Sequence, residues 1–215
     1  TRRMIDRYLK RDVFTSYEDF LENYEVNVPE DFNFGYDVID AYAEEEPERV
    51  ALLWTNDKGD EKRVTYREFK DVTDRCASFF LSIGIEKGDR VMLILKRRIE
   101  WWYTMVALHK IGAVVIPATH MLTSKDIMYR CHMAGISCII ACGDKPITCN
   151  VQKAVRFCPM LRHCISIGPT IPNGWYDFWR GLNEAEPFVK PARNKVSDNF
   201  LLYFTSGTTG EPKMV

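Results

Sequence analysis

The chain has 215 residues, of which 46% are hydrophobic and 27% are charged, and its formal net charge at pH 7 is −1. This length and composition suffice for a buried core, and the near-neutral charge provides no field that would recruit nucleic acid or an anionic membrane. No apolar run approaches the ~18 residues that a membrane-spanning helix needs.

Hydrophobic periodicity divides the chain into an N-terminal segment, residues 1–34, and a regular alternation of elements after Gly35. One short helix is expected in the N-terminal segment, beginning at Tyr17 behind a Thr15 or Ser16 cap. Beyond it we expect helices over residues 36–45, 66–83, 99–110, 125–134, 146–157 and 175–182, and strands over residues 50–54, 90–95, 113–116, 138–141, 164–167 and 200–204.

Local signals support these boundaries. Thr65 and Glu68 form a capping box at the start of one helix, and Gly84 closes that helix. The strand 90–95 is continuously apolar, which indicates burial on both faces. A linker, residues 184–198, precedes the last strand. Strands and helices that alternate in this way predict an α/β fold, a mostly parallel sheet flanked by helices.

The cysteines and histidines show no spacing typical of a metal site. The seven cysteines include no Cys-x-x-Cys pair, and the two closest, Cys138 and Cys142, have no neighbouring histidine. We therefore predict no metal site and reduced, structural thiols in a reducing compartment such as the cytoplasm. The chain begins at Thr1, so an upstream targeting segment, and with it the mitochondrial matrix, stays open. The histidines lie far apart in the sequence, and His120 has no identifiable partner as a base. We therefore assign no catalytic role to any of the four, which are His109, His120, His132 and His163.

One loop carries the clearest chemical signal. Directly after the last predicted strand lie four hydroxyl side chains, two glycines and a lysine within nine residues, namely Thr205, Ser206, Gly207, Thr208, Thr209, Gly210, Glu211, Pro212 and Lys213. Glycines let backbone N–H groups approach a ligand, hydroxyls add donors, and lysine adds a positive charge suited to phosphate. This composition favours a polyphosphate-binding loop, although a Ser/Thr-rich surface turn has the same composition. It is not a Walker loop, because Glu-Pro-Lys follows the second glycine.

The nine residues 205–213 match in full the nucleotide-binding signature of the adenylate-forming superfamily, which the chain resembles. That superfamily includes acyl-CoA synthetases, luciferases and peptide-synthetase adenylation domains. From about Phe32 to the last residue the chain is similar to medium-chain acyl-CoA synthetases. Lys96 and Ala118 stand where that branch usually has proline and glycine, which leaves the fine substrate class open. The residues that carry the similarity, in order and at matching spacing, are 88–91, Arg97, 100–102, Gly112, Pro117 and 126–130.

The resemblance implies ATP as substrate with Mg²⁺, and coenzyme A as co-substrate. All nine loop residues, 205–213, would contact the ATP phosphates, and Lys213, the candidate catalytic residue, would offset charge on the leaving pyrophosphate. Met121 corresponds to a residue that borders the coenzyme A channel in the medium-chain enzymes. Its alternative interpretation is a flexible core filler.

We therefore expect an ATP-dependent acid–thiol ligase of fatty acid metabolism that forms an acyl-adenylate and then an acyl-CoA, from a short- or medium-chain carboxylic acid. A peptide-synthetase-type adenylation domain is an alternative, and Trp101, Trp102 and residues 126–130 argue against it. A non-catalytic nucleotide-binding module is a third interpretation. A homo-oligomer is allowed and not required.

By the resemblance, residues 35–215 are the first α/β subdomain of the AMP-binding domain and end just after the phosphate-binding loop. Members of the superfamily continue with adenine- and ribose-binding residues and a C-terminal domain that carries a lysine for adenylation. None of these follows Lys213 here, so we expect the 215 residues alone to be inactive and the identity of the acid to be unreadable.

Three further side chains have structural interpretations. At least one of Trp101 and Trp102 is expected to pack in the core, because their helix lies between two buried strands. By its place in the resemblance, Arg130 is expected to be either a helix-surface residue or a structural one.

Overall fold

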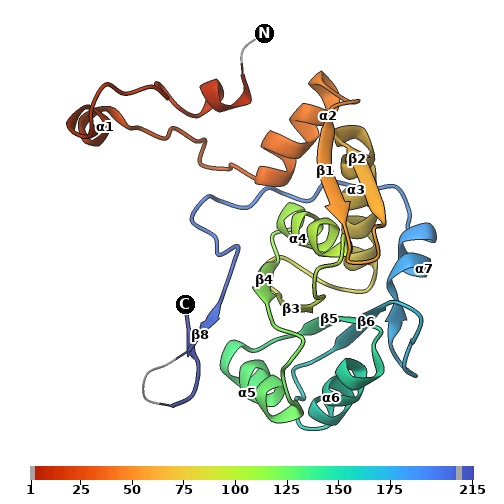
Figure 1. Cartoon of the computed structure of the whole chain (residues 1–215). Coiled ribbons are helices and arrows are strands. Elements are labelled where there is room, and N and C mark those ends of the chain that lie inside the picture. The colour runs from red at the N-terminus through yellow and green to blue at the C-terminus, as the bar shows by residue number, and fades with distance from the viewer. Residues whose placement is uncertain (1–2, 207–209) are drawn as a thin grey trace.

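A computed structural model describes residues 3–206 and 210–215 of the chain, and its centre is a five-stranded sheet. The strands lie in the order β4-β3-β5-β6-β7, and each neighbouring pair is parallel (Figure 1). This confirms the predicted α/β fold with a parallel sheet. The strands are β3 (Arg90–Ile94), β4 (Val114–Pro117), β5 (Cys138–Cys142), β6 (His163–Ile167) and β7 (Tyr176–Asp177).

Helices cover both faces of the sheet. Figure 1 shows α3 (Tyr66–Ser82) and α4 (Glu100–Lys110) on one face, and α5 (Ser124–Ala134) and α6 (Lys145–Val155) on the other. Because both faces are covered, the four β3 residues after Arg90 and all of β5 are buried, as their apolar sequences predict.

Capping side chains fix where two of these helices begin. The Thr65 hydroxyl accepts a hydrogen bond from the Glu68 N–H while the Glu68 carboxylate accepts one from Thr65, which confirms the predicted capping box of α3. At α5 the cap is Thr123, and it forms the same reciprocal pair with Asp126.

Two elements outside the expected pattern are short strands. β2 (Glu61–Thr65) pairs antiparallel with β1 (Val50–Thr55) in a separate sheet. Its sequence, Glu-Lys-Arg-Val-Thr, gives little strand signal, because Val64 is its one apolar residue and also its one buried residue. The prediction of a helix over 175–182 is wrong for the first residues of that range. Tyr176 there belongs to β7, and Asp177 caps a shorter helix, α7 (Phe178–Asn183).

The last predicted strand, residues 200–204, is divided into two parts. Leu201 forms a single parallel bridge with Val115 of β4, and the next residues leave the sheet. They form β8 (Phe204–Thr205), which pairs antiparallel with β9 (Lys213–Met214). The expectation of one continuous strand is therefore wrong, because each part pairs with a different partner.

The N-terminal segment extends away from the α/β body (Figure 1). After a short 3₁₀ turn, η1 (Met4–Arg7), it contains α1 (Tyr17–Asn23), whose Ser16 cap and start are as predicted and which buries no residue. The helix expected over 36–45 forms in two joined parts, a wide π-type turn, η2 (Gly35–Asp40), and α2 (Ala41–Glu45).

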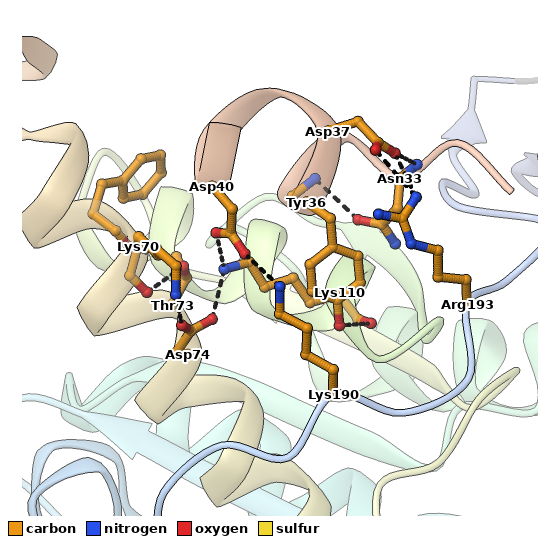
Figure 2. Close-up of polar contacts among 12 residues, drawn as sticks. Asn33, Tyr36, Asp37, Asp40, Lys70, Thr73, Asp74, Lys110, Lys190 and Arg193 are labelled. Carbon is orange, nitrogen blue, oxygen red and sulfur yellow. Dashed lines mark hydrogen bonds and ion pairs between the residues drawn. The ribbon is translucent and has the colours of Figure 1, made fainter. Parts of the chain in front are cut away.

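A buried lysine joins this region to the helices over the sheet. The Lys110 side chain at the end of α4 is 0% exposed, and its Nζ lies 2.6 Å from Asp40 Oδ1 of η2 and 2.7 Å from Asp74 Oδ1 of α3 (Figure 2). The Tyr36 hydroxyl donates to the Lys110 carbonyl at 2.8 Å. At Gly35, an added Cβ would lie 2.6 Å from Lys110 Cγ, so only glycine fits against this side chain.

The linker 184–198 attaches to the same cluster. Lys190 Nζ lies 3.6 Å from Asp40 Oδ2, an oxygen that accepts no hydrogen bond from the described residues. Arg193 lies 3.1 Å from both carboxylate oxygens of Asp37 (Figure 2). Both cations also face the Tyr36 ring, at 4.8 Å and 5.5 Å from its centroid. The linker is thus held along η2 before it reaches β4.

Replacing Lys110 with methionine should destabilise the protein by about 3–5 kcal/mol, because two carboxylates would lose the cation that compensates their burial. The matched control is Lys70→Met. Lys70 pairs with Asp74 at 2.5 Å but is 30% exposed, so its loss should cost less than about 1 kcal/mol. Chemical denaturation of both variants measures the difference. Equal destabilisation would contradict a special role for Lys110.

Candidate functional site: the loop on the β8–β9 hairpin

The candidate phosphate-binding loop lies at the tip of a short hairpin. Thr205 of β8 pairs with Lys213 of β9, and Tyr203 and Val215 exchange two backbone hydrogen bonds of 2.8 Å at the open end. The first and last residues of the sequence motif are therefore cross-strand neighbours. Of the residues between them, Gly207, Thr208 and Thr209 lie outside the described residues.

The hairpin follows a segment that runs parallel to β4. Val115 donates to the Phe200 carbonyl at 2.9 Å and accepts from Leu202 at 3.0 Å. Because this segment runs in the same direction as β4, the chain leaves it toward the carboxyl end of that strand. In parallel sheets this is the edge where ligands usually bind.

The described loop residues present their polar groups to solvent. Thr205, Ser206, Glu211 and Lys213 are exposed, and Lys213 forms no ion pair with any residue that the structure describes. Gly210 has a φ of 136°, a backbone conformation that favours glycine, although a Cβ there would meet no atom within 4 Å. The loop thus offers hydroxyls and a free ammonium on a fixed base.

Helix α5 supports this base. The Tyr129 hydroxyl donates a 2.9 Å hydrogen bond to the Pro212 carbonyl, and the Arg130 guanidinium lies 5.1 Å from the centroid of the Phe204 ring. The expectation that Arg130 is structural agrees with this contact. The sequence alone did not indicate that α5 reaches the loop, because 83 residues separate Tyr129 from Pro212.

Met121 lies in the segment that follows β4. Its side chain is 75% exposed, so the interpretation as a core filler is wrong. The neighbouring Leu122 is the buried residue of this segment, at 7% exposure. Met121 donates its N–H to the Thr119 hydroxyl at 3.3 Å, and its side chain is accessible from solvent. Contact with coenzyme A stays a prediction.

The two neighbouring tryptophans have different surroundings. Trp101 packs against the core, as expected for at least one of them, whereas Trp102 is 46% exposed. Their rings meet edge to face with centroids 4.8 Å apart. With Trp54 and Arg97 they line an open cleft of about 480 Å³ next to the end of β3, which the sequence did not reveal.

The titratable groups of the core favour no acid–base or thiolate role. Burial lowers the pKa of His109 to about 4, and its Nε2 accepts a hydrogen bond from the Phe34 N–H, so the ring is neutral at pH 7. All seven cysteines are free thiols. Burial raises the pKa of Cys142 to about 11 and of Cys164 to about 12, so neither is a thiolate at pH 7.

Residues 3–206 and 210–215 contain neither a metal-binding cluster nor a membrane-spanning helix. No three His, Cys, Asp or Glu side chains there are grouped so that they could hold a metal ion. None of the helices in these ranges combines the length and apolar character of a membrane span.

Comparison with known proteins identifies the family. Residues 39–215 match the family of AMP-binding enzymes, and the chain belongs to that family. It is 37% identical over 194 residues to the mitochondrial acyl-coenzyme A synthetase ACSM5 of Rattus norvegicus, covering 87% of this chain and 33% of that protein. It is 35% identical over 193 residues to the mitochondrial acyl-coenzyme A synthetase ACSM1 of Homo sapiens, with the same coverage of 87% and 33%.

Solved structures of acyl-CoA ligases share the fold of this chain. The acyl-CoA synthetase of Brucella canis superimposes with a TM-score of 0.73 at 26% identity, over 86% of this chain and 33% of that chain. An anthranilate CoA ligase, AuaEII, solved with anthranoyl-AMP, superimposes with a TM-score of 0.74 over 87% of this chain and 35% of that one. At 20% identity this superposition shows a common fold alone. The predicted resemblance and fold class are confirmed. The chain spans about a third of the length of the relatives it matches.

Proposed function

We propose that the protein carrying this chain is an ATP-dependent acyl-CoA synthetase for a short- or medium-chain carboxylic acid. In the first step, the carboxylate attacks the α-phosphorus of ATP, which gives an acyl-adenylate and pyrophosphate. In the second step, the thiol of coenzyme A attacks the acyl carbon and AMP leaves. The observation that carries the proposal is the loop 205–213, held by the β8–β9 hairpin in a chain of the AMP-binding family.

The loop would act on the polyphosphate of ATP. Hydroxyls and backbone N–H groups of residues 205–210 would orient the β- and γ-phosphates, and Glu211 and Pro212 would complete the turn. Lys213 is exposed and has no ion-pair partner among the described residues, so its ammonium is available to offset charge on the leaving pyrophosphate. Mg²⁺ would enter with ATP as part of the substrate, since triphosphates bind it through their oxygens.

Coenzyme A is the proposed acceptor, and Met121 a proposed contact for it. The exposed thioether beside the end of β4 suits an apolar contact with the pantetheine arm. A peptide-synthetase-type domain would transfer the acyl group to a carrier protein instead. The named relatives are acyl-coenzyme A synthetases, which favours the thiol of coenzyme A over a carrier protein as the acceptor.

The compartment and assembly also belong to the proposal. The relatives are mitochondrial by name, which supports the mitochondrial matrix over the cytoplasm that cysteine usage suggested. Residues 1–34 and 35–215 remain the proposed division into an N-terminal segment and an α/β subdomain. A homo-oligomer is the proposed assembly, and light scattering on the purified protein would test it.

The substrate class is tested by pyrophosphate release from the full-length protein. We expect release with monocarboxylic acids from butyrate to octanoate, or with branched or aromatic acids of similar size, and thioester formation only when coenzyme A is added. Amino acids and carrier proteins serve as the comparison. Release confined to amino acids would overturn the proposal, and no release with any acid would favour a non-catalytic nucleotide-binding module.

Lys213→Ala should slow adenylate formation by ~10²–10³, because a preorganised cation then no longer meets the charge that develops on pyrophosphate. Thioester formation from the isolated acyl-adenylate should lose much less, since pyrophosphate has already left. Single-turnover measurements separate the two steps. The control is Lys153→Ala, which removes an exposed lysine on α6. Equal losses in both steps would assign Lys213 to the fold or to AMP binding.

A further inference from the structure

A single side chain of α5 contacts the residues on both sides of the phosphate loop at its base. The Tyr129 hydroxyl donates to the Pro212 carbonyl, one residue before β9, at 2.9 Å. The Tyr129 ring also meets the Phe204 ring of β8 edge to face, with centroids 6.4 Å apart. Tyr129 therefore bridges the two ends of the segment that the sequence motif occupies.

The neighbouring residue strengthens the same contact. The Arg130 guanidinium lies 5.1 Å from the centroid of the Phe204 ring, close enough for a cation–π attraction. The Arg130 Nη1 also donates to the Asp126 carbonyl one turn earlier at 3.2 Å, which limits the positions the guanidinium can take. Phe204 is thus held by two consecutive side chains of one helix.

Helix α5 is a firm support for these contacts. Its first turn is closed by the capping box of Thr123 and Asp126. Ile127 and Cys131, at 1% and 0% exposure, fix its inner face in the core. A donor on such a helix limits the movement of the group that accepts its hydrogen bond. A donor on an exposed loop would move together with the acceptor and would not hold it in place.

The acceptor is one peptide bond away from Lys213. The peptide plane between Pro212 and Lys213 is rigid, and the proline ring fixes φ on its other side. Holding the Pro212 carbonyl therefore sets the direction in which the Lys213 N–H and Cα leave the turn. Since the Lys213 ammonium has no ion-pair partner among the described residues, the backbone determines where it can reach.

We propose that Tyr129 is a positioning residue for the adenylate-forming step. Its contacts are with Pro212 and Phe204, and it acts by holding Pro212, and through it Lys213, at the base of the phosphate loop. The inference rests on the proposed function, because it assumes that Lys213 stabilises the pyrophosphate as it leaves.

The first test is Tyr129→Phe in the full-length protein, which keeps the ring on Phe204 and removes only the hydrogen bond. A neutral hydrogen bond contributes about 1 kcal/mol, or about 5-fold in rate. We expect the single-turnover rate of adenylate formation at saturating ATP to fall about 5-fold. The KM for the acid and the rate of thioester formation from isolated acyl-adenylate should stay within about 2-fold of wild type.

The matched control is Tyr66→Phe on α3. The Tyr66 ring stacks on Tyr42 with centroids 4.5 Å apart, and its hydroxyl makes no hydrogen bond with the described residues. This variant should behave as wild type in both half-reactions. If Tyr129→Phe slows both half-reactions equally, or neither, the positioning role is overturned.

A second readout does not depend on activity. Trypsin cleaves after lysine, so the rate of cleavage after Lys213 in the substrate-free protein reports how firmly the base of the loop is held. Tyr129→Phe should be cleaved there about 5-fold faster than wild type, and Tyr66→Phe at the wild-type rate. An unchanged rate of cleavage after Lys213 in Tyr129→Phe would overturn the positioning role of Tyr129, even if the enzyme is active. A wild-type protein that forms no adenylate would overturn the proposed function, while the cleavage rates would still decide whether Tyr129 holds the loop.

Discussion

The buried charge of Lys110 is the constraint on which the arrangement of the chain depends. An ammonium that is 0% exposed requires compensation inside the protein, and it receives that from Asp40 and Asp74. These three residues come from η2, α4 and α3, so pairing them fixes the N-terminal part of the fold against the helices over the sheet. Lys190 joins the same cluster from the linker, so the chain is guided along η2 toward the edge of β4.

The candidate phosphate-binding loop combines a backbone that is held at its base with side chains that are exposed to solvent. Its base is fixed by the pairing of Leu201 with β4 and by the contact of Tyr129 with Pro212. The described side chains at its ends, such as Ser206 and Lys213, face solvent. The proposed function, in which the loop would bind a polyphosphate and then release pyrophosphate, calls for both properties, because fixed donors lower the reorganisation required during reaction and open access lets the product leave.

Local patterns predicted most of the sheet and its helices, because the apolar strand 90–95 and the Thr65–Glu68 capping box carry their signals within a few residues. Elements with weak local signals were missed. All residues of β2 except the buried Val64 are polar, and β7 has only two residues. The Lys110 cluster could not be predicted, since its partners lie 36 and 70 residues away along the chain. The loop motif was found from its sequence, but its contact with α5 depends on the folded chain.

The most direct test of the central claim is to follow the oxygen atoms of the carboxylic acid. The full-length protein would be given an acid labelled with ¹⁸O in both carboxylate oxygens, together with ATP and coenzyme A, and the products analysed by mass spectrometry. Attack of the carboxylate on the α-phosphorus predicts one ¹⁸O atom in AMP and none in pyrophosphate. Label in orthophosphate with ADP as the co-product, or unlabelled AMP beside newly formed acyl-CoA, would contradict an acyl-adenylate intermediate.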